Sequence, residues 1–124
     1  MAVQLAAAHA LADPSIPAAI RAKYQRRLQK LVAALNAVGF TAAMPGGTYF
    51  LYVKSPKGAG DLTFANGEEA SQYLIRDQSV CCVPWDDAGN YLRFSVTYTA
   101  ATEADEDDLM RETVTRLRAM RLRF

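Results

Sequence analysis

A strand with an arginine at its centre constrains this chain more than any other feature. The segment Tyr91–Thr97 reads Tyr-Leu-Arg-Phe-Ser-Val-Thr, and successive residues of a strand point to opposite faces of a sheet. Leu92, Phe94 and Val96 therefore share one face, which is suited to a core. Arg93 belongs to the other face. The strand thus predicts a sheet with one apolar face and one face that offers a cation.

The Arg93 side chain needs a partner if it lies on the interior of a sheet. A guanidinium is costly to desolvate, and its rigid fork suits a carboxylate held by two parallel hydrogen bonds. The partner can be a carboxylate from outside the chain. It can equally be an internal Asp or Glu, or the arginine can lie in water. The residues alone leave these alternatives open.

The remaining segments predict the order helix, helix, strand, helix, strand, strand, helix. The elements include an alanine-rich helix over 2–12, a long helix that ends before Gly39, a strand over 48–53, a helix over 66–78 and a helix that begins after Thr102 and carries its apolar stripe to Phe124. The other two strands fall within 80–97. We expect one domain over 1–124, an α+β two-layer sandwich in which a small, mainly antiparallel sheet has helices on one face.

The strand over 48–53 has bulky side chains on both faces. Phe50 and Tyr52 alternate with Tyr49, Leu51 and Val53. A two-layer domain needs only one apolar face on its sheet, so the second bulky face predicts cover from another domain or subunit. Gly46-Gly47 before this strand is interpreted as a turn that can let a ligand approach, because two glycines entering a strand are weak evidence for a phosphate site.

Charge and cysteine usage exclude several classes of protein. Fourteen basic and thirteen acidic side chains leave a formal charge of +1, so no nucleic-acid or membrane partner is indicated. The basic residues of the long helix are interpreted as an ordinary solvated face. No apolar run approaches a membrane span, the N-terminus lacks the features of a secretory signal, and two adjacent cysteines suit a reducing compartment. We therefore expect a soluble, cytoplasmic protein.

Conventional catalytic constellations are missing. His9 is the only histidine, so neither a His-dependent triad nor a multi-histidine metal site can be assembled. Cys81 and Cys82 are interpreted as small strand hydrophobes rather than nucleophiles, and Asp86 and Asp87 as turn formers. We predict no catalytic residue and no metal site in this chain.

A series of short motifs resembles the C-terminal part of the class I/II aminotransferases, the fold-type I enzymes that use pyridoxal 5'-phosphate. The resemblance covers nearly the whole chain, and it is closest to the branch of LL-diaminopimelate aminotransferases. The motifs are Tyr24-Gln25-Arg26-Arg27-Leu28, Gly39-Phe40, Pro45-Gly46-Gly47-Thr48-Tyr49-Phe50-Leu51-Tyr52, Val83-Pro84-Trp85 and Tyr91-Leu92-Arg93-Phe94-Ser95.

The resemblance implies a role for Arg93. In the family, the arginine of the matching strand grips the α-carboxylate of the amino-acid substrate while an amino group moves to pyridoxal phosphate and then to a 2-oxo acid. Arg93 is therefore the expected substrate-binding residue. The resemblance also implies a homodimer for the intact enzyme and places this chain as its small domain, with the large cofactor-binding domain missing.

The groups that hold the cofactor in the family are not found here. None of the four lysines lies in the setting that the family uses for the lysine that binds the cofactor. We therefore expect no cofactor bound by this chain alone and no transamination by it alone. The alternative function is a free-standing, non-catalytic α+β module that binds a small carboxylate or a protein partner. A degraded copy without activity is a third, plainer reading.

Overall fold

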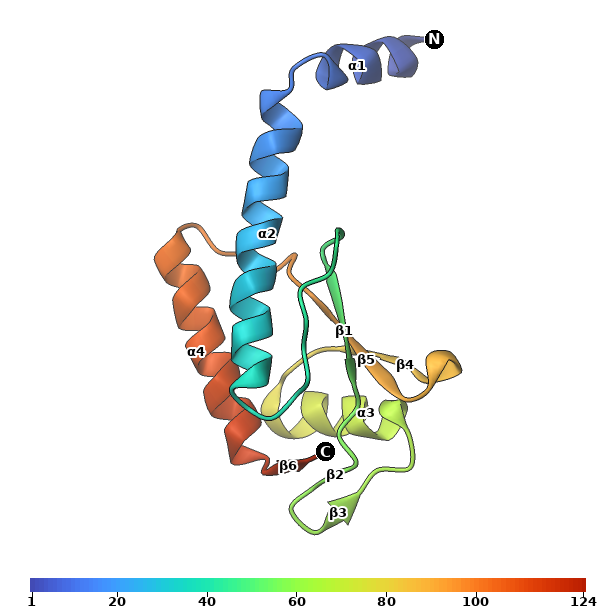
Figure 1. Ribbon diagram of the computed structural model, residues 1–124, viewed down its shortest axis with the longest axis vertical. Coiled ribbons are helices and arrows are strands. Elements are labelled where there is room, and N and C mark those ends of the chain that lie inside the picture. The colour runs from blue at the N-terminus through green and yellow to red at the C-terminus, as the bar shows by residue number, and fades with distance from the viewer.

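Four α-helices and two small sheets make up the computed structural model, which describes residues 1–124 (Figure 1). The main sheet has three antiparallel strands in the order β1-β5-β4, with β1 over Phe50–Lys54, β5 over Tyr91–Ser95 and β4 over Val83–Trp85. β5 is the central strand. In its register, Arg93 lies between Tyr52 of β1 and Val83 of β4.

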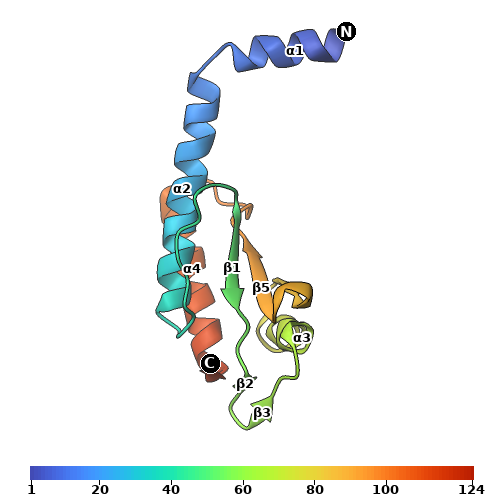
Figure 2. The same cartoon turned by 45° about the vertical axis from the view of Figure 1, so that its right-hand side comes forward.

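The helices gather on one side of the main sheet. Helices α2 (Ser15–Asn36) and α4 (Glu103–Ala119) lie side by side. Both views place them on the same side of β1 and β5 (Figures 1 and 2). Helix α3 (Gly67–Gln78) packs against β4 and β5. The α+β fold with helices on one face of a small antiparallel sheet is therefore confirmed.

The core forms where these helices meet the sheet. Alternate strand residues are buried there, because the pleat turns every second side chain toward the helices. The helices contribute leucines and methionines at spacings of three or four residues. The largest contributions come from Leu28, Leu31, Leu35, Leu51, Val53, Leu74, Leu92, Phe94, Val96, Met110 and Leu117.

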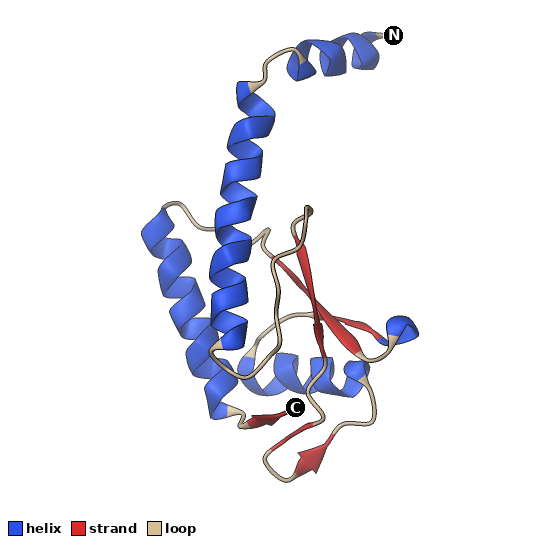
Figure 3. Ribbon diagram, in the orientation of Figure 1, coloured by secondary structure: helices blue, strands red, loops and turns tan.

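A second small sheet was not predicted. Its strands have the order β3-β2-β6, with β2 over Gly58–Ala59, β3 over Leu62–Thr63 and β6 over Leu122–Arg123, and it lies beside the C-terminal end of α4 (Figure 3). The expectation that the last helix carries Phe124 on its stripe is wrong. Helix α4 ends at Ala119, and Arg121 adopts a left-handed φ of +49° that turns the chain toward β2. The ring of Phe124 instead packs against Phe40, with ring centroids 4.7 Å apart.

Helix α1 (Ala2–Leu11) projects away from the rest of the fold (Figure 1). None of its residues is buried, and its alanine-rich sequence supplies few large side chains for packing. None of the helices combines the length and apolar character that a membrane crossing requires.

Candidate functional site

The helix-free face of the main sheet carries Arg93 at its centre. The alternation of β5 turns Arg93 to the face opposite the one that buries Leu92 and Phe94, as the sequence predicted. Tyr91 of the same strand shares this face, and so do three aromatic side chains at the matching alternate positions of the flanking strands. They are Phe50 and Tyr52 of β1 and Trp85 of β4.

Aromatic rings, rather than carboxylates, surround the Arg93 guanidinium. Its Cζ atom lies 4.4 Å from the centre of the Phe50 ring and 5.3 Å from the centre of the Trp85 ring. Both distances are within the range of cation–π attraction, which is worth roughly 0.5–2 kcal/mol per ring. The rings stabilise the cation and leave its donors unused.

The Arg93 side chain has no hydrogen-bond partner within the chain. No ion pair includes it, and its Nε atom is buried without an acceptor. The alternative in which Arg93 pairs with an internal Asp or Glu is therefore wrong. A buried donor without an acceptor costs about 1–3 kcal/mol, which a native chain tolerates where an acceptor arrives from outside. The face is suited to a ligand that brings negatively charged oxygens.

The loop that follows Trp85 is anchored to α3. The Asp86 carboxylate accepts hydrogen bonds from the backbone N–H groups of Gly67, at 2.7 Å, and Glu68, at 3.0 Å. These groups lie in the first turn of α3, where N–H donors have no helical partner and negative charge is favoured. Asp86 is therefore more than the turn former that the sequence indicated. Asp87, by contrast, has no such contact.

Gly67 makes the Asp86 contact possible. A Cβ atom at this position would lie 2.6 Å from Asp86 Oδ1 and 3.0 Å from the carbonyl oxygen of Tyr91. The expected cap of the same helix is also present, because Asn66 Oδ1 accepts from the N–H of Glu69 at 3.0 Å. Two acceptors thus serve different donors of one helix start.

A buried cluster of charges lies on the helical side of the sheet. Glu106 of α4 is only 2% exposed, and its carboxylate accepts from Arg27 at 2.7 Å and from Arg26 at 3.0 Å and 3.2 Å. Lys30 lies 3.3 Å from it. The Arg26 and Arg27 hydrogen bonds favour the charged form and lower the pKa of Glu106 to about 2, even though burial opposes this.

The same cluster fixes the chain where it leaves β5. Arg27 donates to the carbonyl oxygens of Tyr98, at 2.6 Å, and Val96, at 3.2 Å. Its guanidinium also lies 4.4 Å from the centre of the Tyr98 ring. The interpretation of the basic residues on the long helix as a wholly solvated face is therefore wrong for Arg27, which is 3% exposed. Its role is structural support of β5.

We assign no nucleophile or base among the cysteines and the histidine. Burial raises the pKa of the Cys82 thiol to about 11, and its sulfur donates to Ser71 Oγ at 3.6 Å. Cys81 is exposed, and His9 lies on the exposed surface of α1. The buried Cys82 thiol is therefore protonated at neutral pH.

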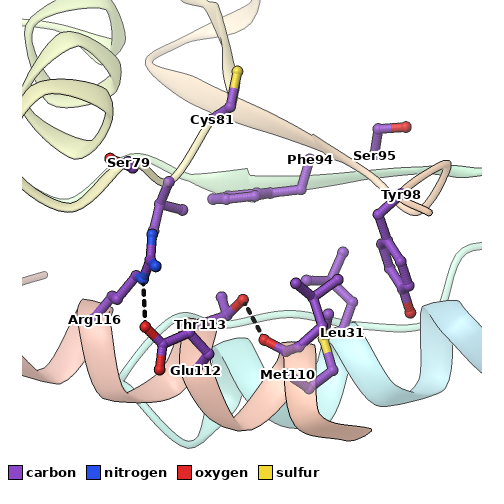
Figure 4. A pocket seen from close by; sticks show the side chains of 12 residues that line it. Leu31, Ser79, Cys81, Phe94, Ser95, Tyr98, Met110, Glu112, Thr113 and Arg116 are labelled. Atoms are coloured by element: carbon purple, nitrogen blue, oxygen red, sulfur yellow. Dashed lines mark hydrogen bonds and ion pairs between the residues drawn. The ribbon is translucent and has the colours of Figure 1, made fainter. Parts of the chain in front are cut away.

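A separate cavity of about 270 Å³ lies between α4, the segment before β4 and the end of β5 (Figure 4). Leu31, Phe94 and Met110 give it an apolar lining. The Tyr98 hydroxyl is buried and has no partner. Arg116 at this cavity is already paired with Glu112, at 2.8 Å. Arg93 does not line the cavity, so the two regions are distinct.

The Gly46-Gly47 turn borders an open groove of about 600 Å³ beside α2. A Cβ atom at either glycine would meet nothing within 4 Å, so no close approach within the chain requires them. Tyr24 and Tyr49 line the same groove, with ring centroids 5.7 Å apart. The turn thus leaves space next to the strand that carries Phe50.

Comparison with known families gives a match over most of the chain. The sequence model described as "Aminotransferase class I and II" matches residues 1–112. An LL-diaminopimelate aminotransferase of Methanocaldococcus jannaschii is 45% identical over 130 residues, which cover 98% of this chain and 31% of the relative. An LL-diaminopimelate aminotransferase of Methanococcus maripaludis is 45% identical over 121 residues, covering 93% of this chain and 29% of that protein. The chain therefore spans less than a third of the length of these relatives.

Solved structures share the fold at lower sequence identity. Substrate-bound BacF from Bacillus subtilis aligns with a TM-score of 0.72 and 23% identity, covering 90% of this chain and 27% of its own. An aromatic aminotransferase from Pyrococcus horikoshii aligns with a TM-score of 0.70 and 22% identity, covering 94% of this chain and 31% of its own. In both cases a part of a larger protein has the fold described above.

Proposed function

Because this chain belongs to the class I and II aminotransferases, we propose that it forms the part of a pyridoxal-phosphate-dependent enzyme that binds the substrate carboxylate. The reaction is the transfer of an amino group between an amino acid and a 2-oxo acid. The names of the two LL-diaminopimelate aminotransferases support an amino donor related to LL-diaminopimelate.

The observation that carries the proposal is the unpaired guanidinium of Arg93. It lies on the helix-free face, without an internal carboxylate and with a buried Nε that lacks an acceptor. Both partners of an amino-group transfer, the amino acid and the 2-oxo acid, carry a carboxylate next to the reacting carbon. One cation can therefore hold both in turn and fix that carbon in a constant position.

We assign no residue of this chain a role in holding pyridoxal phosphate. When bound, this cofactor supplies the electron sink for amino-group transfer. Lys30 is engaged by Glu106 and Asp107, Lys23 lies on the same helix, and Lys54 and Lys57 lie at the end of β1 and in the loop after it. We place the cofactor-binding groups outside the 1–124 domain, in a large domain that would cover the aromatic face, and assign no catalytic step to this chain.

The experiment that tests this role replaces Arg93 in the intact transaminase that carries this sequence. Losing one partner of a desolvated, hydrogen-bonded charge pair costs about 2–5 kcal/mol, so Arg93→Ala should lower kcat/KM by roughly 30- to 4000-fold. Arg93→Lys keeps the charge but loses the forked donor geometry, so it should also lower kcat/KM, by at least about tenfold. Arg118→Lys, on the exposed side of α4, is the matched control.

An unchanged kcat/KM in both Arg93 variants would refute the assignment. Equal losses with amino acids and with the corresponding amines that lack the carboxylate would refute it as well, because the guanidinium would then act through something other than the carboxylate.

A second function is favoured by the exposure of the aromatic face. Tyr52 is 46% exposed and Trp85 is 40% exposed, and both lie beside a cation that needs no cofactor to be in place. A free-standing module could use this face to bind a small carboxylate or a protein partner. Binding of an amino acid by the purified 124-residue chain alone, lost in Arg93→Ala, would favour this function over the first.

A further inference from the structure

We infer that Trp85 is a positioning residue for Arg93, and that Asp86 holds Trp85 in that role by capping α3. On the proposed function, which this inference deepens, Arg93 then offers a carboxylate its two terminal nitrogens rather than Nε. The chain of contacts runs from the first turn of α3 through the β4–β5 loop to the centre of the sheet.

Trp85 and Tyr52 meet across the central strand. They belong to β4 and β1, the two outer strands, which are separated by two strand spacings, about 9.6 Å. Their rings nevertheless approach to 5.9 Å between centroids, edge to face, at an interplanar angle of 88°. The two side chains therefore lean toward each other over β5, which lies between them.

The register places Arg93 on the strand between these two residues. Tyr52 is directly opposite Arg93 on one side, and Trp85 is opposite Tyr91, one alternate position away, on the other. No helix covers this face, and yet Nε of Arg93 is buried. We attribute that burial to the rings of Phe50 and Trp85, whose centres lie 4.4 Å and 5.3 Å from the Arg93 Cζ atom.

The covered Nε leaves only the terminal nitrogens available. Neither Nη atom has a hydrogen-bond partner in the chain, and neither is buried as Nε is. A carboxylate can grip a guanidinium through Nε and one Nη or through both Nη atoms, and only the second mode is open here. The aromatic rings thus select the end-on mode and restrict the rotamers of the side chain.

Asp86 gives Trp85 a fixed backbone. It follows Trp85 directly and holds two N–H groups of α3, at 2.7 Å and 3.0 Å. Gly67 permits this approach because a side chain there would collide with Asp86 Oδ1. A helix start is a rigid anchor, whereas a loop without such a contact would let the indole ring move. Asp87, the next residue, provides a matched control that lacks these bonds.

The test measures the Arg93 Nε–H directly by ¹⁵N NMR of the full chain. Its hydrogen exchange with water should be slower than that of the exposed Arg118, and Trp85→Ala should accelerate it at least about tenfold by opening the cover. Trp85→Phe should restore most of the protection. Asp86→Ala should accelerate exchange by about threefold or more, since the indole is then less fixed, while Asp87→Ala should leave the rate unchanged.

The functional readout is the division between KM and kcat in the intact transaminase. Loss of one ring contact of about 1 kcal/mol predicts a fivefold rise in KM for the amino donor in Trp85→Ala, with kcat changed much less. Unchanged Nε–H exchange in both Trp85→Ala and Asp86→Ala would overturn the inference. If Trp85→Ala fails to fold, Asp86→Ala against Asp87→Ala decides.

The two failures are distinguishable. If Arg93→Lys lowers kcat/KM while Trp85→Ala changes neither exchange nor KM, the positioning inference fails and the proposed function stands. If Nε–H exchange responds to Trp85→Ala but KM is unchanged by substitution of either Trp85 or Arg93, the proposed function fails. The positioning of Arg93 by Trp85 then stands, but Arg93 does not bind the substrate carboxylate.

Discussion

Replacement of Glu106 by glutamine is the most informative test of how the fold is held together. The carboxylate is 2% exposed and meets three cations, of which Arg27 is itself 3% exposed. Glutamine keeps the size of the side chain and removes its charge. Arg27 then remains buried without a counter-charge, because the packing of α2 against α4 keeps its guanidinium out of contact with water.

The expected loss follows from the contacts that remain. Breaking a buried ion pair by removing one partner costs about 3–5 kcal/mol. Arg27 keeps two carbonyl acceptors, at 2.6 Å and 3.2 Å. We therefore expect Glu106→Gln to lower the free energy of unfolding by about 3 kcal/mol, the lower end of that range. With a urea m-value of about 1.5–2 kcal/mol/M, the midpoint of unfolding should move down by about 1.5–2 M.

Urea unfolding of the full chain measures this loss, and Glu112→Gln is the matched control. Glu112 belongs to the same helix and pairs with Arg116 at 2.8 Å, but the pair is exposed and should contribute less than about 1 kcal/mol. A Glu106→Gln variant within 1 kcal/mol of the parent chain would refute the reasoning. It would mean that the desolvation cost of the cluster cancels its attraction.

The pH dependence gives an independent check with a defined sign. The hydrogen bonds from the arginines hold the pKa of Glu106 at about 2 in the folded chain, below its ordinary value of 4.5. The unfolded chain therefore binds a proton first as pH falls, and the contribution of this group is present above pH 4.5 and lost toward pH 2. The parent chain should lose stability across this window faster than Glu106→Gln. Parallel losses in the two proteins would contradict the assigned pKa.

Two further predictions concern the cysteines and the glycines. Cys81 should react with iodoacetamide in the native chain at pH 8, whereas Cys82 should react only on unfolding, because it is buried and its pKa is raised to about 11; equal rates by mass spectrometry would contradict this. Gly67→Ala should lower stability by about 1–3 kcal/mol in thermal unfolding, because its Cβ would lie 2.6 Å from Asp86 Oδ1 and 3.0 Å from the Tyr91 carbonyl oxygen. Gly46→Ala, which meets nothing within 4 Å, should be neutral or slightly stabilising.

The parts of the fold that depend on local pattern could be predicted from the sequence. The alternation of β5 placed Leu92 and Phe94 in the core and Arg93 on the other face, because the pleat has a fixed period of two. The helix starts at Asn66 and Thr102 were equally local, since a cap and its donor lie three residues apart.

The contacts that the sequence did not reveal join residues far apart along the chain. Arg27 and Glu106 are separated by 79 residues, and Asp86 and Gly67 by 19. A basic helix face and an acidic first turn each have an ordinary solvated explanation, and only the approach of α2 to α4 turns them into a buried cluster. The short strand β6 is another example, because it is defined by its pairing with β2, which lies far from it along the chain.

These distant contacts bear on Arg93 because they fix both ends of its strand. Beyond the C-terminal end of β5, Arg27 holds the carbonyl oxygens of Val96 and Tyr98, and the N–H of Val96 donates to Tyr49 at 3.0 Å. Before its N-terminal end, Asp86 ties the preceding loop to α3. A side chain in the middle of a strand anchored on both sides keeps its direction without a ligand. On the proposed function, a carboxylate that binds there would have less ordering entropy to overcome, because the strand that carries the unpaired guanidinium is already fixed.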